Sequence, residues 1–154
     1  MAADPIETLR SLAVQARKER DLALARLGQA QLAERAAQAQ AEQLATYRDD
    51  YKRRWGDRFT QTTSTLLLQC YQGFAERLQH AIAHQAQTVH QASLRQQQAS
   101  QAWLRQEQRV AAVDKLIERR LAARSRITQR LDQRESDEFA ARRSAIRRPA
   151  ESPF

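Results

Sequence analysis

The chain has 154 residues and a formal net charge of +8, and aromatic residues make up only 6% of it. Three glycines and three prolines stand against an abundance of Ala, Leu, Gln, Arg and Glu, which are good helix formers. This composition excludes a compact globule, which needs more apolar volume, and favours a coiled coil, which needs only a narrow apolar seam. The positive charge suits nucleic acid, anionic lipid or an acidic protein partner without choosing among them.

We expect the first helix over residues 5–54. Asp4 can cap it, Pro5 suits the first helical position, and Glu7 follows the cap at the spacing of a capping box. Residues repeating at alternating steps of three and four form a heptad seam that is mostly apolar. Many of them are alanine, so the partner helix should approach closely. The seam consists of Ile6, Leu9, Ala13, Ala16, Arg20, Ala23, Leu27, Ala30, Glu34, Ala37, Ala41, Leu44, Arg48 and Tyr51.

A break in the helical pattern is expected near Gly56, ahead of a Thr/Thr/Ser/Thr run that favours capping over helix interior. We place a turn over residues 55–63, centred near residue 59. The predicted fold is therefore all-α: one domain over 1–154 that forms an antiparallel two-helix coiled coil, or helical hairpin, with a longer second helix.

The second helix is expected over residues 64–148, starting at Thr63 or Ser64, with residues 149–154 as a tail. Its seam shows a discontinuity around Gln85. Before it the seam contains Leu67, Tyr71, Phe74, Leu78 and Ala81. After it the seam contains Val89, Ala92, Gln96, Ala99, Trp103, Gln106, Val110, Val113, Ile117, Arg120, Arg124, Ile127 and Leu131.

The second helix should extend beyond the N-terminal end of the first. A turn centred near residue 59 puts Ile6 opposite Val113, so residues 114–148 would have no partner within the chain. Basic residues outnumber acidic ones there. A lone helix of this kind is marginal by itself, so it should either fray or be held by a partner. Its exposed apolar residues would be Ile117, Leu121, Ile127, Leu131 and Phe139.

No arrangement of residues predicts catalysis, a cofactor or a metal. His80 and His84 share a helix face at a spacing that zinc sites use, but no Glu or Cys completes a ligand set. The three glycines are scattered and form no phosphate loop, and two rods offer no concave pocket for a catalytic triad. Acidic residues interrupt the basic C-terminal stretch and no nucleic-acid module is present, so we expect no nucleic-acid partner.

The cellular setting follows from what the chain lacks. Cys70 is the single cysteine, which favours a reducing cytoplasm over a disulfide framework. The first ten residues lack the apolar core of a signal peptide, and no apolar run approaches the ~18 residues of a membrane span.

Three stretches resemble the flagellar FliJ family: LDQRESDEFAARRSAIRRP at the C-terminus, and YRDDY and FAERLQHAIAHQ beside the turn. The C-terminal matches are Leu131, Asp132, Gln133, Asp137, Glu138, Phe139, Ala140, Arg142, Arg147, Arg148 and Pro149. The resemblance covers essentially the whole chain.

This resemblance implies a hairpin similar to the central stalk of rotary ATPases. It implies a non-enzymatic component of the flagellar export apparatus at the cytoplasmic face of the inner membrane, peripheral through its partners. Those partners would be the export ATPase, the cytoplasmic domain of the membrane export gate protein, and export chaperones. The C-terminal family residues and both helix ends opposite the turn would face the ATPase.

The resemblance also implies a gate-binding patch. It carries over to Gln40, Leu44, Tyr47, Tyr51, Phe74, Leu78 and Ala81. One further family position is a histidine, where this chain has Gln85 with His84 beside it. From the residues alone, aromatic side chains near the turn either form the last core layers of the hairpin or form an exposed apolar patch that binds a partner.

Two alternative functions stay open. The equivalent stalk protein of a virulence type III secretion system shares this architecture, although the DEFA-type C-terminus favours the flagellar protein. A basic coiled-coil protein that binds nucleic acid or anionic membrane is the alternative from another class.

Overall fold

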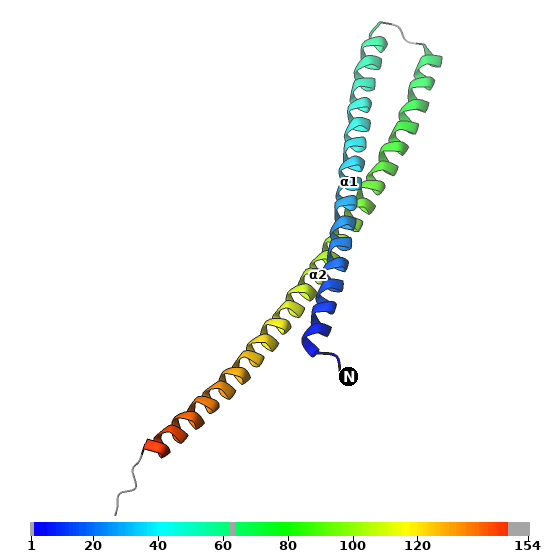
Figure 1. The fold of residues 1–154 in the computed structure, drawn as a ribbon. Coiled ribbons are helices and arrows are strands. Elements are labelled where there is room, and N and C mark those ends of the chain that lie inside the picture. Colours follow the sequence, from blue (N-terminus) through cyan, green and yellow to red (C-terminus); the bar gives the residue numbers. More distant parts are fainter. Residues whose placement is uncertain (1, 62–63, 148–154) are drawn as a thin grey trace, which may run out of the picture. The chain divides into compact units, whose positions relative to one another are not determined.

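The computed structural model describes residues 2–61 and 64–147, which form two helices and no strand (Figure 1). The helices, α1 (Pro5–Phe59) and α2 (Thr65–Arg147), pair as an antiparallel hairpin, which confirms the expected fold class. Their contacts group into two compact units, which we call the terminal unit (Met1–Arg17 with Gln108–Phe154) and the turn unit (Lys18–Glu107). That the chain is one domain stays a prediction. Thr63, Arg148 and the expected tail lie outside the described residues.

The start of each helix follows from a capping residue. The Ile6 N–H donates to the Asp4 carboxylate at 3.1 Å, and the Thr8 N–H donates to the Asp4 carbonyl at 3.1 Å. Asp4 therefore caps α1 as expected, with Pro5 in the first helical position. At α2 the Leu68 N–H donates to the Ser64 carbonyl at 3.1 Å, so Ser64 occupies the cap.

The inner face of α1 is the predicted seam. Every position expected in that seam is buried or half-buried. Ala16 is 0% exposed, and a side chain this small lets the backbone of α2 approach closely. The seam is dominated by small residues because a two-helix structure has no third element to fill a wider core. The buried alanines of α1 are Ala13, Ala16, Ala23 and Ala37.

The seam of α2 changes register slightly earlier than expected. Ala81 is exposed and Ile82 is half-buried in its place, so a step of four from Phe74 to Leu78 is followed by a second step of four from Leu78 to Ile82. The expected one-residue discontinuity therefore lies between Leu78 and Ile82, and Ala81 is not a seam residue, because the larger Ile82 side chain covers more apolar surface than Ala81 would. Leu67 is also exposed, whereas the positions expected from Val89 to Ile117 are buried or half-buried.

The break at Gly56 is not present, since α1 continues through it to Phe59. One glycine in a helix costs about 1 kcal/mol relative to alanine. Against this, the rings of Trp55 and Phe59 lie 5.7 and 5.5 Å from the ring of Tyr71 on α2, and each such aromatic pair contributes about 0.5–1.5 kcal/mol. Ring packing across the hairpin therefore outweighs the helix-breaking tendency of the glycine.

Replacing Gly56 by alanine should stabilise the protein. A Cβ at this position would meet nothing within 4 Å, and no glycine here has a positive φ. Gly56→Ala is expected to raise the free energy of unfolding by about 0.5–1 kcal/mol, measured by urea unfolding followed by circular dichroism. The reverse change at an exposed position of the same helix, Ala33→Gly, should lower it by a similar amount. A destabilising Gly56→Ala would contradict this account.

The register of the two helices differs from the one expected for a turn centred near residue 59. In the terminal unit Asp4 pairs with Arg124 at 3.6 Å, and Arg17 pairs with Asp114 at 2.9 Å. The expected register put Asp4 opposite Asp114. The longer α1 moves the turn toward the C-terminus, and every pairing moves with it.

The unpaired extension of α2 is consequently shorter than expected. It begins after about Arg124 and not at Asp114, because Asp114 pairs with Arg17 of α1 and Arg124 pairs with Asp4, the cap of α1. All residues from 118 to 147 are exposed, and Ile117 is half-buried. Leu121, Ile127, Leu131 and Phe139 are exposed as predicted.

Candidate functional site

The turn unit carries a cluster of aromatic rings next to the turn. Four come from α1 at intervals of one helical turn, Tyr47, Tyr51, Trp55 and Phe59, and α2 supplies Tyr71 and Phe74. Residues four apart lie on one face of a helix, so the four α1 rings form a continuous ladder. We call these six residues the aromatic cluster.

Tyr51 is the centre of the aromatic cluster. Its ring centroid lies 4.4 Å from that of Phe74, 5.6 Å from Tyr71, 5.9 Å from Trp55 and 6.3 Å from Tyr47. These separations are within the range in which aromatic pairs attract beyond the burial of area. The cluster therefore closes the hairpin at its turn end.

Tyr47 is the member of the cluster with the most accessible ring. It is 51% exposed, its ring contacts Tyr51, and it lies edge-on to Phe74 at 6.1 Å. It also lines two neighbouring surface hollows. One holds about 490 Å³ and is lined by Ala39, Glu42, Gln43, Thr46, Tyr47 and Asp50.

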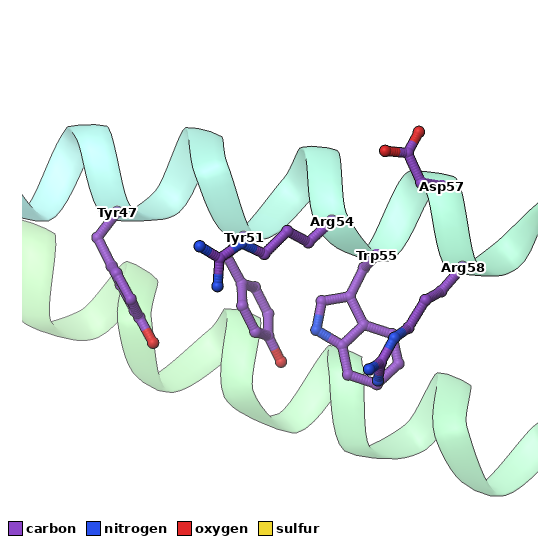
Figure 2. Close-up of a pocket in the computed structure, with 6 residues that line it drawn as sticks. All are labelled: Tyr47, Tyr51, Arg54, Trp55, Asp57 and Arg58. Atoms are coloured by element: carbon purple, nitrogen blue, oxygen red, sulfur yellow. The ribbon is translucent and has the colours of Figure 1, made fainter.

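The second hollow holds about 450 Å³ and lies entirely on α1. Figure 2 shows the Arg54 side chain running back toward Tyr51 and the Arg58 side chain running back toward Trp55. The Arg58 guanidinium carbon lies 5.7 Å from the centre of the Trp55 ring, a cation–π distance. This hollow is lined by Tyr47, Tyr51, Arg54, Trp55, Asp57 and Arg58.

The predicted gate-binding residues all lie in the turn unit, but they differ in accessibility. Gln40, Tyr47 and Ala81 are exposed, Leu44, Tyr51 and Phe74 are half-buried, and Leu78 is 8% exposed. The structure brings Tyr47, Tyr51 and Phe74 together. Leu78 lies between the helices, where it can position them and offers almost no surface to a partner.

The edge of this patch is occupied by Gln85. Its amide nitrogen donates to the Ala37 carbonyl at 2.9 Å and to the Gln40 side chain at 3.3 Å. His84 points elsewhere and is exposed. Gln85 therefore bridges the two helices, and it holds Gln40 of the predicted patch by a hydrogen bond.

The predicted patch did not include Trp55, Phe59 and Tyr71, although all three belong to the aromatic cluster. Trp55 and Phe59 fell outside the first helix when it was expected to end at residue 54. The signal that could have found them is the spacing of four that links Tyr47, Tyr51, Trp55 and Phe59. Tyr71 was expected in the seam and is half-buried there.

The C-terminal family residues up to Arg147 lie on the extension of α2 in the terminal unit. Leu131, Asp132, Asp137, Glu138, Phe139 and Arg142 are all exposed and helical. Phe139 is 66% exposed, and the Gln133 amide donates to the Asp137 carboxylate at 3.0 Å, which supports the helix locally.

The comparison with protein families decides the relationship. The model of the family described as Flagellar FliJ protein matches residues 5–149. The chain belongs to the FliJ family. No curated protein matches the chain in sequence. FliJ membership makes this chain a component of a flagellar type III export apparatus.

Metal sites and membrane spans were both expected to be absent. Over the part of the chain that the structure describes, no three His, Cys, Asp or Glu side chains gather to hold a metal ion, and no helix is long and apolar enough to cross a membrane. Exposed aromatic side chains lie in the aromatic cluster, at Tyr47, and on the extension of α2, at Phe139.

Proposed function

We propose that this chain is a non-enzymatic stalk of the flagellar export apparatus that links the export ATPase to the cytoplasmic domain of the membrane export gate protein. It would promote assembly of the ATPase ring, help export and handle substrate chaperones. It would work at the cytoplasmic face of the inner membrane, held there by its partners. The observation that carries this proposal is a half-exposed tyrosine held in an aromatic cluster at the turn end of a FliJ-family hairpin.

The aromatic cluster suits the gate contact. Binding hot spots are enriched in Tyr, Trp and Arg, and the cluster with its two arginines provides all three. Tyr47 gains rigidity from Tyr51 and Phe74, so little side-chain freedom is lost when a partner docks. Leu78 and Tyr51 would act by holding that surface in place.

The extension of α2 suits the ATPase contact. Leu131 and Phe139 are exposed on a helix that has no partner among the described residues beyond about Arg124. A single helix of this kind is marginal in water, and docking of its apolar residues would stabilise it. Acidic Asp132, Asp137 and Glu138 interrupt the arginines, which disfavours a nucleic-acid arm.

The gate contact is tested by Tyr47→Ala. Loss of an exposed aromatic anchor should weaken binding to the gate's cytoplasmic domain by about 2 kcal/mol, or roughly 30-fold, measured by titration calorimetry. The matched control is Leu32→Ala, which removes a 65% exposed apolar side chain from the same helix outside the cluster. Wild-type binding by Tyr47→Ala with an unchanged helical spectrum would show that the patch is wrongly assigned.

A further inference from the structure

Two pairs of an aromatic residue and an arginine repeat on one stretch of α1. Arg54 follows Tyr51 by three residues, and Arg58 follows Trp55 by three. Side chains on a helix lean toward its N-terminus, so each arginine comes to lie beside the ring that precedes it, as Figure 2 shows. Both guanidinium groups line the 450 Å³ hollow together with the rings.

The two arginines in this hollow form no ion pair among the described residues, whereas neighbouring arginines of α1 do. Arg48 pairs with Asp49 at 3.2 Å, and Arg53 pairs with Asp50 at 2.7 Å. Within the described residues Arg54 has no ion pair or hydrogen bond. The Arg58 guanidinium group packs on the face of the Trp55 ring. Figure 2 shows the Asp57 carboxylate directed away from the rings. Asp57 also lines the hollow but, among the described residues, forms no ion pair with either arginine, so two guanidinium groups remain there without a bound carboxylate.

The geometry of these groups selects a ligand. Guanidinium groups bind carboxylates through two parallel hydrogen bonds, and arginine held against an aromatic face has lost part of its freedom already. Residues four apart on a helix are separated by about 6 Å along its axis. Two carboxylates one helical turn apart on a partner helix have the same separation, so they can engage Arg54 and Arg58 together.

A phosphate-rich surface fits less well. Asp49, Asp50 and Asp57 lie on the same stretch of α1 as the two arginines. Against a membrane or a nucleic-acid backbone, where negative charge is continuous, these carboxylates would be repelled. A protein segment can place two carboxylates at the arginines and neutral groups elsewhere.

We propose that the Arg54–Arg58 hollow binds an acidic protein segment through two carboxylates about 6 Å apart, with an apolar side chain of that segment packed on Tyr47 and Trp55. The proposal deepens the gate contact at Tyr47 and rests on it for the identity of the partner, but not for the chemistry of the ligand.

The test uses the full chain and two labelled helical peptides. One carries two glutamates four residues apart with leucines beside them, and the other has glutamines in place of the glutamates. Fluorescence anisotropy should show that the wild type prefers the glutamate peptide by about tenfold, the combined effect of two solvent-exposed ion pairs. Arg54→Gln with Arg58→Gln should abolish that preference.

The control variant is Arg48→Gln with Arg53→Gln. It changes the net charge equally on the same helix but removes arginines that already pair with Asp49 and Asp50. It should retain most of the preference. Equal binding of both peptides by the wild type, or equal losses in both variants, would overturn the proposal. So would binding of anionic lipid vesicles or duplex DNA as tightly as the glutamate peptide with the same dependence on Arg54 and Arg58.

Assays with the gate domain separate this inference from the proposed function. If the wild type prefers the glutamate peptide but does not bind the gate domain, the gate contact is refuted and the acidic ligand stands. If Tyr47→Ala loses gate binding while Arg54→Gln with Arg58→Gln keeps it fully, the gate contact stands and the acidic ligand is refuted for that partner.

Discussion

Tyr51→Ala is expected to lower the free energy of unfolding by about 2–3 kcal/mol. Removing a large buried aromatic side chain costs about 3–5 kcal/mol, and Tyr51 is only half-buried, which places it below that range. Its ring touches four others, so the loss includes several aromatic pairs as well as buried area. Urea unfolding followed by circular dichroism at several protein concentrations measures the change.

Tyr51→Phe separates the ring from its hydroxyl. It keeps every ring contact and should stay within about 0.5 kcal/mol of the wild type. If Tyr51→Ala were equally mild, the aromatic cluster would not stabilise the turn end of the hairpin. This pair of variants also explains why the gate test uses Tyr47: a binding defect in Tyr51→Ala would mix loss of contact with loss of structure.

Ending the chain at Ser125 is expected to weaken binding to the export ATPase while the hairpin stays folded. The shortened chain keeps the Asp4–Arg124 and Arg17–Asp114 pairs and the buried Val110 and Val113, so its unfolding midpoint should change little. It loses Leu131, Phe139 and the rest of the C-terminal family residues. We expect at least about a tenfold weakening of ATPase binding, measured by calorimetry, because apolar anchors dominate such interfaces.

A chain ending at Val113 is the comparison that tests the register. It removes Asp114, Ile117 and Arg124 from the terminal unit and should be less stable than the chain ending at Ser125. Wild-type ATPase binding by the chain ending at Ser125 would assign the contact to another surface. Equal stability of the two shortened chains would contradict the pairing of residues 114–124 with α1.

The sequence was sufficient to predict the fold because a heptad seam encodes its own geometry. Alternating steps of three and four keep one face toward the partner, whatever the length of the helix. Asp4 and Pro5 are local signals, and local signals predict local structure. The inner positions of α1, from Ile6 to Tyr51, follow from this rule alone.

The turn and the register could not be obtained this way. Gly56 is a sound local signal for a break, but the rings of Trp55, Phe59 and Tyr71 override it, and such packing is visible only once both helices are in place. The pairing of Asp4 with Arg124 depends on where the turn falls. An early end to α1 therefore shifts every expected partner in the same direction.

The candidate site was predicted partly through resemblance. The resemblance assigned Tyr47, Tyr51 and Phe74 to one patch, and the structure brings these three rings into contact. It did not distinguish the buried Leu78 from the exposed Tyr47, since accessibility depends on the register. Arg54 and Arg58 were not singled out, because an arginine in an arginine-rich chain carries no signal until its neighbours are seen to be paired.

The two tryptophans give the hairpin its own optical reporters. Trp55 lies among the rings of Tyr51, Phe59 and Tyr71, so light absorbed by the tyrosines can pass to its indole, and its emission will respond to a partner at the turn end. Trp103 lies in the seam, where, among the described residues, its buried indole N–H has no hydrogen-bond partner. Water reaching that N–H when the helices separate would shift its emission to the red. Docking at the turn and opening of the seam can therefore be followed separately without an added dye, once Trp103→Phe or Trp55→Phe leaves a single emitter.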